Sequence, residues 1–136
     1  MERLRERVAV ARRALTTLEE LLAVPNPSAV ERDAAIQRFE YSFEATWKAV
    51  QRCLEVVEGL TIGSPKGVVR ASLQVGLLDE ESARSGLDMA DDRNLTAHTY
   101  NEALAAAIFA RLPGHATVLH VWLAAVERRR SFELSI

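Results

Sequence analysis

The chain has 136 residues, of which 49% are hydrophobic and 26% are charged, and its formal net charge at pH 7 is −2. This apolar content is enough to fill the core of a single domain over residues 1–136, and it excludes a fully disordered chain. The slightly negative charge argues against a protein that binds nucleic acid through bulk positive charge, although it leaves room for a small local basic site.

Individual residue types narrow the class of protein further. The single cysteine, Cys53, allows no internal disulfide and no cysteine-based zinc site. We expect no metal and no cofactor: His115 and His120 match no metal-ligand spacing, and GSPKG at 63–67 is not a phosphate-binding P-loop. The charged start MERLRER is not a signal peptide, and no apolar run approaches the roughly 20 residues that span a bilayer. We therefore expect a cytoplasmic protein without a membrane partner.

The first predicted element is a helix over about residues 2–23. Apolar residues recur there every three or four positions, from Leu4 to Leu22, and so form one stripe along a helix. The segment PNPS that follows ends the helix, because proline lacks a backbone donor and restricts the residue before it.

The second predicted helix runs from about Ser28 to Glu58 and carries the strongest periodic pattern of the chain. Ser28 and Glu31 have the spacing of a capping box, and Gly59 is placed to end the helix. The apolar stripe has members three or four positions apart: Ile36, Phe39, Phe43, Trp47, Val50, Leu54 and Val57. We interpret the aromatic part of this stripe as core or dimer interface rather than as a surface for stacking nucleic-acid bases.

Two shorter helices are predicted next. Ser64 can cap a helix that has Pro65 at its first position and that Gly76 closes. Asp79 can cap a fourth helix, whose first turn begins with two glutamates and which we expect to run to about Arg93. Both starts place a short polar side chain where a helix needs an acceptor for its free backbone N–H groups.

The last third of the chain also reads as helix. Thr99 and Glu102 have the spacing of a second capping box, which predicts that a helix begins near Tyr100. Pro113 and the glycine after it should interrupt or kink this helix, and a last helix should end in the run of arginines at 128–130. No segment alternates convincingly with a period of two residues. The prediction is therefore an all-α, up-and-down bundle of four to six helices.

The segment DDRNLTAHTY, residues 91–100, gathers polar side chains at the expected joint between two helices. The cap at Thr99 would place Arg93 in the last turn of one helix and His98 just before the next, so that a short joint could turn both toward one spot, with Tyr100 nearby. Arginine offers a fork of donors to a phosphate group, and histidine can move a proton near neutral pH. These residue types indicate phosphate chemistry, such as cleavage of RNA without a metal.

Neighbouring polar residues have two interpretations each. Asn94 could orient a reacting group, and Asp92 could position His98 or Arg93, or simply face water. Lys66 could contact phosphate beside the motif, or lie on a solvated helix face. The plain alternative for the whole segment is a helix end with a cationic side chain, followed by a polar joint.

The motif RNLTAHTY resembles the Arg-x4-His-x-Tyr signature of HEPN domains, and specifically that of the HepT-like nucleotidyltransferase substrate-binding family. Three longer segments are also similar to that family's patterns, in the same order: RFEYSFEATWKAVQ at 38–51, GSPKGVVRASLQVGLL at 63–78 and MADDRNLTAHTYNE at 89–102. This chain departs from the family at Gly86, where relatives often carry a bulky aromatic residue.

The resemblance implies an all-α HEPN-like bundle that dimerises, with the arginine and histidine motifs of both protomers in one cleft. It implies a cognate minimal nucleotidyltransferase as partner, in a heterotetramer or larger assembly, and a HepT-type toxin–antitoxin pair. By motif position, Arg93, His98 and Asn94 are then the expected catalytic residues of a metal-independent ribonuclease that acts on RNA. Tyr100 is the expected acceptor of AMP, which silences the toxin.

Three functions stay open at this point. The chain can be a partner and substrate-binding subunit of a minimal nucleotidyltransferase, an active ribonuclease that uses Arg93 and His98, or a purely structural helical adaptor. The first two can describe one protein, and a nucleotidyltransferase gene beside this one would favour them over the third.

Overall fold

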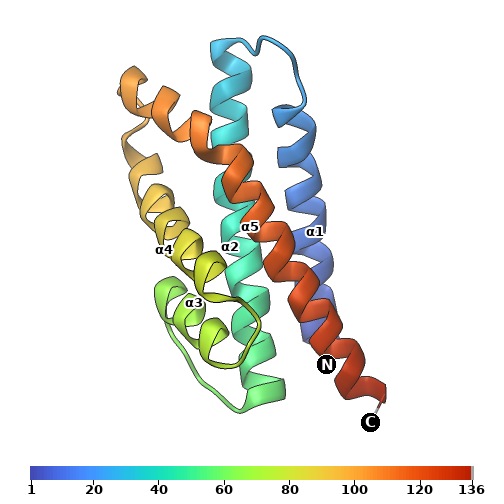
Figure 1. Cartoon of the computed structure of the whole chain (residues 1–136). Helices are drawn as coiled ribbons and strands as arrows, with labels where there is room; N and C mark the ends of the chain where they lie inside the picture. Colours follow the sequence, from blue (N-terminus) through green and yellow to red (C-terminus); the bar gives the residue numbers. More distant parts are fainter. Residues whose placement is uncertain (136) are drawn as a thin grey trace.

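The chain forms an up-and-down bundle of helices in a computed structural model that describes the backbone of residues 1–135 and the side chains as far as residue 130. Its elements are α1 (Glu2–Leu22), α2 (Ala29–Glu58), α3 (Pro65–Gln74), α4 (Glu80–Leu95), the 3-10 helix η1 (Thr96–His98) and α5 (Glu102–Ser135). Figure 1 shows the short α3 beside the lower parts of α2 and α4, and η1 at the opposite end of the bundle from the two chain ends. The described residues contain no strand, so the predicted all-α bundle is confirmed.

Most helix boundaries lie where local capping groups predict them. The Ser28 hydroxyl accepts the Glu31 N–H at 3.1 Å, and the Glu31 carboxylate accepts the Ser28 N–H at 2.9 Å, so the capping box of α2 is present. The side chains of Ser64 and Asp79 cap α3 and α4 in a similar way, by each accepting a backbone N–H of the first turn. Gly59 ends α2 in the left-handed conformation, with φ of 71°.

α5 is the element that differs most from the sequence prediction. It runs as one helix through Pro113, so that the predicted last helix is its second half. Figure 1 shows that α5 bends along its upper part and does not break. A proline inside a helix removes one hydrogen bond and crowds the preceding turn, which bends the helix where packing on neighbouring helices holds both halves in place.

The composition of α5 also resembles that of a membrane span. By length and composition alone, its segment Glu102–Arg130 is the one stretch of the described chain that could cross a membrane, with a mean hydropathy of 1.2 over the best 18-residue window. The core helix of a bundle has the same composition, and 39% of this window is buried inside the chain. The contacts of α5 with α1, α2 and α4 account for this buried part of the window.

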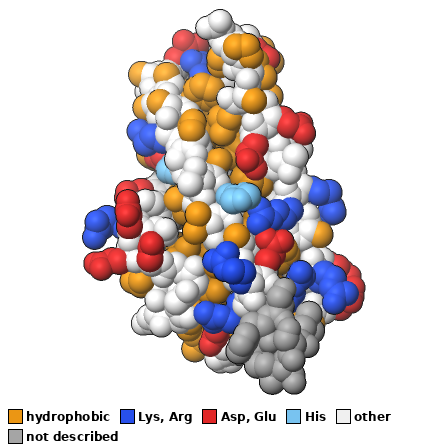
Figure 2. Space-filling model, turned by 45° about the vertical axis from the view of Figure 1, so that its right-hand side comes forward, with side chains coloured by type: hydrophobic (Ala, Val, Ile, Leu, Met, Phe, Trp, Pro, Cys, Tyr) orange, Lys and Arg blue, Asp and Glu red, His pale blue; other side chains and the backbone are white. Residues whose placement is uncertain are grey.

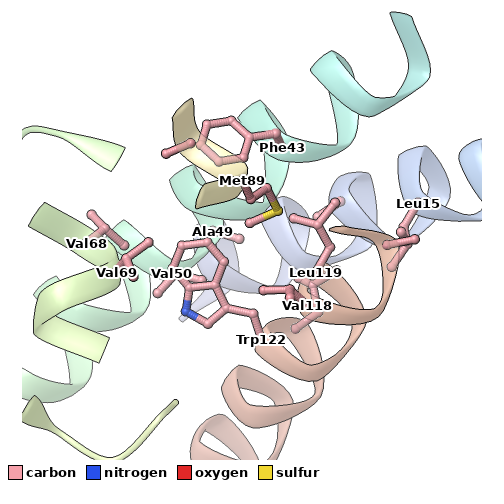
Figure 3. Close-up of a cluster of buried hydrophobic side chains, with 14 of the residues drawn as sticks. Leu15, Phe43, Ala49, Val50, Val68, Val69, Met89, Val118, Leu119 and Trp122 are labelled. Atoms are coloured by element: carbon pink, nitrogen blue, oxygen red, sulfur yellow. The ribbon is translucent and has the colours of Figure 1, made fainter. Parts of the chain in front are cut away.

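The core lies where α5 packs against the other helices. Figure 3 shows apolar side chains from several helices meeting around Trp122 and Met89. Trp122 is fully buried, and its indole N–H donates to the Ser72 hydroxyl of α3 at 3.0 Å. Phe39 and Phe43 of the predicted stripe are buried as core residues, whereas the third aromatic residue, Trp47, is only partly buried.

The helices α3 and α4 approach each other closely at Gly86. A Cβ atom at this glycine would lie 3.2 Å from Val69 Cγ1, which is tighter than ordinary van der Waals contact. A bulky aromatic side chain at this position would therefore require α3 and α4 to move apart. The close approach brings the start of α3 beside the last turns of α4, where Lys66 and Arg93 line one pocket.

A separate groove lies between α1 and α5. Figure 2 shows hydrophobic side chains gathered in the upper half of this side of the molecule, with charged side chains on both flanks. The groove has a volume of about 510 Å³ and is lined by Glu19, Leu22, Ala23, Pro113, Ala116, Thr117, His120 and Val121. None of the residues that the sequence marks as functional lines it.

Candidate functional site

Arg93 lies in the last turn of α4 and its guanidinium faces α2. One terminal nitrogen donates to the Thr96 hydroxyl at 3.2 Å, and the group lies 3.8 Å from a Glu40 oxygen and 3.6 Å from a Glu44 oxygen. Distances of that length are ion pairs without a direct hydrogen bond. The side chain is 28% exposed. Arg93 therefore keeps most of its five donors without an acceptor among the described residues.

Arg93 and Asn94 line a pocket of about 440 Å³ between α2, the start of α3 and α4. Lys66 lines the same pocket, and its Nζ lies 2.5 Å from Asp91 Oδ1. Two cations and an amide are donor groups that suit a phosphate, and Glu44 is the opposing charge on the pocket wall. The structure thus brings three of the residues singled out from the sequence to one hollow.

His98 and Tyr100 lie on the joint but outside this pocket. His98 is the last residue of η1, and Tyr100 follows in the turn before α5. Both side chains are exposed, Tyr100 to 84%, and their rings meet edge to face with centroids 6.1 Å apart. Because His98 does not line the Arg93 pocket, a single chain does not place the guanidinium and the imidazole in one cavity.

The predicted capping box of Thr99 and Glu102 is wrong. The Thr99 hydroxyl donates to the Thr96 carbonyl at 3.1 Å and so closes the 3-10 turn. Asn101 is the cap instead: its Oδ1 accepts the N–H of the third helical residue at 3.0 Å, and α5 begins at Glu102. The reason is that η1 lengthens the joint by two residues, and asparagine caps a helix as well as threonine does. Tyr100 consequently lies in an open turn.

Asp92 serves neither of the two residues that the sequence suggested for it, and it does not face water. It is 6% exposed, and its carboxylate faces α5. Arg111 donates to both oxygens at 2.7 and 2.8 Å, and His115 Nε2 lies 2.6 Å from Oδ2. The correction has a geometric cause: neighbouring helix residues differ by about 100° in direction, so Asp92 faces α5 while Arg93 faces α2.

We refer to Asp92, Arg111 and His115 as the Asp92 cluster. Burial by itself would raise the pKa of Asp92, but hydrogen bonds from Arg111 and His115 outweigh it and hold that pKa below its ordinary value. The hydrogen bond from Asp92 raises the pKa of Arg111. The His115 ring stacks on Phe39 of α2, with centroids 5.3 Å apart and an angle of 23° between the planes. The cluster therefore joins α4 to α5 through charged groups and packs against α2.

Arg111 and His115 were not predicted as partners of Asp92, although two patterns in the sequence mark them. They are four residues apart and therefore lie on one face of α5. Asp92 continues a buried stripe of α4, three positions after Met89 and four before Thr96. A carboxylate within an apolar stripe needs a charged or hydrogen-bonding partner, and an arginine–histidine pair on another helix is the kind of partner to look for.

The joint can support two kinds of chemistry. Phosphodiester cleavage needs donors to the phosphate and a group that moves a proton, and Arg93 and the imidazole of His98 are groups of these two kinds. The exposed phenol of Tyr100 is open to covalent modification. Among the side chains that the structure describes, no three or more His, Cys, Asp or Glu residues are grouped so as to hold a metal ion.

Comparison with known proteins relates this chain to one family. Residues 6–128 match the family described as nucleotidyltransferase substrate binding protein like. A probable ribonuclease HepT of Haemophilus influenzae is 33% identical over 82 residues, which are 57% of this chain and 55% of that protein. The match thus spans about half the length of that curated relative.

Solved structures share the fold. A crystal structure of a Thermus thermophilus protein is 58% identical and has a TM-score of 0.83, over 85% of this chain and 98% of the other. A Haemophilus influenzae structure, described as the fold of a substrate binding domain of a nucleotidyltransferase, has a TM-score of 0.73 over 88% and 98% of the two chains. Its identity is 23%, so this likeness concerns the fold alone.

Proposed function

This chain belongs to the nucleotidyltransferase substrate binding protein-like family, and on that premise we propose that it is the partner subunit of a minimal nucleotidyltransferase, of the HepT toxin type, in a toxin–antitoxin pair. The observation that carries the proposal is the Tyr100 phenol, which is 84% exposed in the turn beside His98. An enzyme that modifies a side chain must enclose it, and this phenol stands clear of its own chain.

The modification is a transfer of AMP from ATP. The Tyr100 oxygen bonds to the α-phosphorus, the bond from that phosphorus to the β-phosphate oxygen breaks, pyrophosphate leaves, and the phenol proton passes to a base of the partner or to water. The product carries a phosphodiester charge close to His98, whose ring centroid lies 6.1 Å from that of Tyr100. A phosphate held there competes with RNA for the joint, which gives the partner a means to silence the toxin.

Mass spectrometry tests this step directly. Incubation with the cognate nucleotidyltransferase and ATP should add one or more AMP units of about 329 Da to the intact chain. Tyr100→Phe should remove the shift. Tyr41→Phe is the matched control because Tyr41 is the other tyrosine of the chain and is 49% exposed. A wild-type chain that gains no mass, or a gain that survives Tyr100→Phe, contradicts the proposal.

The same joint also supports an active ribonuclease, with Arg93 and His98 as catalytic residues. His98 accepts the proton of the 2′-hydroxyl, the 2′-oxygen bonds to phosphorus, the bond to the 5′-oxygen breaks, and that oxygen takes up a proton from water as it leaves. Arg93 and Asn94 donate to the non-bridging oxygens, on which negative charge grows in the transition state. The supporting observation is the guanidinium of Arg93, which lines a pocket and makes only one hydrogen bond among the described residues.

The position of His98 leads to a proposal about assembly. Within one chain this histidine lies outside the pocket that Arg93 lines. We propose that two copies pair through their joints, so that the arginine and histidine of both copies line one cleft for RNA. With the nucleotidyltransferase bound, the assembly would be a heterotetramer or larger. Molecular mass in solution, measured alone and with the partner, tests this arrangement.

Cleavage of tRNA or mRNA in the presence of EDTA tests the catalytic assignment. Arg93→Ala and His98→Ala should each reduce cleavage about 100-fold or more, the usual effect of losing a transition-state donor or a proton carrier. Arg84→Ala is the matched control, because Arg84 lies on α4 and is 72% exposed. If wild type and both variants cleave equally, the activity is contamination and the catalytic assignment fails.

A further inference from the structure

The Asp92 cluster closes the segment that contains the proposed functional residues of the joint. Asp92 directly precedes Arg93, and its partners Arg111 and His115 lie 19 and 23 positions further along the chain, after the joint and the first turns of α5. The whole motif therefore lies in a loop of chain whose two ends are tied together by partly buried charge-assisted hydrogen bonds.

These hydrogen bonds fix direction as well as position. Arg111 engages both oxygens of Asp92 at 2.7 and 2.8 Å, a fork geometry that a planar guanidinium makes only when the carboxylate lies in its plane. His115 holds one of those oxygens at 2.6 Å while its ring stacks on Phe39 of α2. The carboxylate of Asp92 is thus oriented by groups that are themselves held by two other helices.

Orientation of Asp92 sets the direction of the next residue. Neighbouring residues on a helix point about 100° apart, so a fixed Asp92 leaves Arg93 one direction, toward α2 and the pocket. The ion pairs of Arg93 itself restrain its direction less, since Glu40 and Glu44 lie 3.8 and 3.6 Å from it. The rotation of the last turn of α4 is therefore determined on the α5 side of the helix.

Stability alone does not account for charged groups at this place. Buried ion pairs lose hydration, and apolar side chains of similar volume often hold two helices together equally well. An apolar contact, however, tolerates small rotations of one helix against the other, whereas a two-pronged hydrogen bond does not. What the charged groups add is a defined rotation.

We propose that Asp92, Arg111 and His115 are positioning residues for the reaction at the joint: they orient the last turn of α4 so that Arg93 enters its pocket and so that η1 presents His98 to RNA. This inference rests on the proposed ribonuclease function. None of the three is a catalytic residue, because each acts through the direction of Arg93 or His98.

Steady-state kinetics of RNA cleavage test the inference with Arg111→Gln, Asp92→Asn and a matched control. The control is Arg129→Gln, which removes an α5 arginine that bonds Glu58 and the Val75 carbonyl far from the joint. Arg111→Gln and Asp92→Asn should lower kcat about 10- to 100-fold with KM little changed, as expected for loss of a group that orients a catalytic residue. Arg129→Gln should lower Tm and leave kcat unchanged.

A conservative variant separates the effect of the positive charge of Arg111 from the effect of its two-pronged hydrogen bond. Arg111→Lys keeps the positive charge but cannot form the fork, so it should restore Tm more fully than kcat. If Arg111→Gln retains the wild-type kcat, or if kcat falls with Tm in the same proportion for Arg111→Gln and Arg129→Gln, the positioning role is wrong. Should Asp92→Asn fail to fold, Arg111→Gln decides the matter, since that side chain is 48% exposed.

A second readout does not depend on cleavage. The Nε atom of Arg93 is buried, so its proton should exchange slowly enough to be followed by NMR in arginine-labelled protein. Arg111→Gln should shift this resonance, whereas Arg129→Gln should leave it in place. An Arg93 resonance that stays in place in Arg111→Gln overturns the inference. If Arg111→Gln shifts the Arg93 resonance as expected but the wild-type chain cleaves no RNA, the proposed ribonuclease is overturned instead.

Discussion

Two arginines at the end of α4 and the start of α5 have opposite environments. Arg111 donates to both oxygens of the buried Asp92 at 2.7 and 2.8 Å. The Arg93 guanidinium makes one hydrogen bond among the described residues, to Thr96, and lies 3.6 and 3.8 Å from two carboxylates. Hydrogen bonding thus separates an arginine that ties α4 to α5 from one that keeps most of its donors without an acceptor among the described residues.

The largest expected change in stability comes from removing the hydrogen bonds between Arg111 and Asp92. Asp92→Ala leaves His115 buried without its acceptor and removes the fork of Arg111. We expect the free energy of unfolding to fall by about 2–3 kcal/mol, less than for a fully buried pair because water still reaches Arg111. Urea denaturation measures this change. A loss below about 0.5 kcal/mol, typical of an exposed site, would show that the cluster does not hold α4 to α5.

A smaller effect is expected where α5, the helix that carries Arg111, begins. Asn101→Ala removes the side chain that accepts a first-turn N–H at 3.0 Å and should lower the free energy of unfolding by about 1 kcal/mol. Thr99→Ala is the control, because that hydroxyl caps no helix and only closes the 3-10 turn. Thermal unfolding of both variants compares them, and a greater loss in Thr99→Ala would contradict the assignment of the cap.

Acid should gradually weaken the stabilisation that the Asp92 cluster provides. The pKa of Asp92 is lower in the folded chain than in the unfolded chain, where it is about 3.9, so the cluster stabilises the fold fully above that pH. The stabilisation is lost as the pH falls through the lower pKa of the folded state. The difference in unfolding free energy between wild type and Asp92→Asn should therefore shrink as the pH is lowered from about 5 to 3. A difference that grows in acid contradicts this sign.

The smallest effect on stability is expected on the Arg93 side. Arg93→Gln removes two long ion pairs and one partly exposed hydrogen bond, so the free energy of unfolding should change by less than about 0.5 kcal/mol. The same variant should lose most RNA cleavage. Arg93 would then matter more than Arg111 for cleavage, whereas Arg111 matters more for stability. Urea denaturation and RNA cleavage should be measured on one preparation of this variant. A loss of stability as large as that of Asp92→Ala would show that Arg93 stabilises the fold as much as the Asp92 cluster does.

The parts of the fold that follow from sequence are those set by local contacts. Ser28, Ser64 and Asp79 cap their helices, and Gly59 ends α2, because each acts on backbone groups within a few residues. The motif residues were found in the same way, from their spacing in one short segment. Local rules failed in two places, both on α5. The helix continues through Pro113, where a break or kink and a separate last helix were predicted. At its start, Thr99 and Asn101 are both good caps and the length of the 3-10 turn decides between them.

The partners of the site residues could not be predicted because they are distant in sequence. Nothing within a turn of Asp92 indicates that Arg111 and His115, on another helix, hold its carboxylate. The approach of Glu40 and Glu44 to Arg93 depends in the same way on how α2 packs against α4. Spacing along one helix gives the face on which a residue lies, but the group opposite that face is set by the packing of the bundle.

The chain ends lie far from the joint. Figure 1 shows residue 1 and the end of α5 at one end of the bundle and η1 at the other. The 34 residues of α5 span about 50 Å at 1.5 Å per residue, somewhat less with its bend. A fusion protein, a fluorescent label or a sensor chip attached at either terminus would therefore leave Tyr100 and the Arg93 pocket open to an incoming enzyme or RNA.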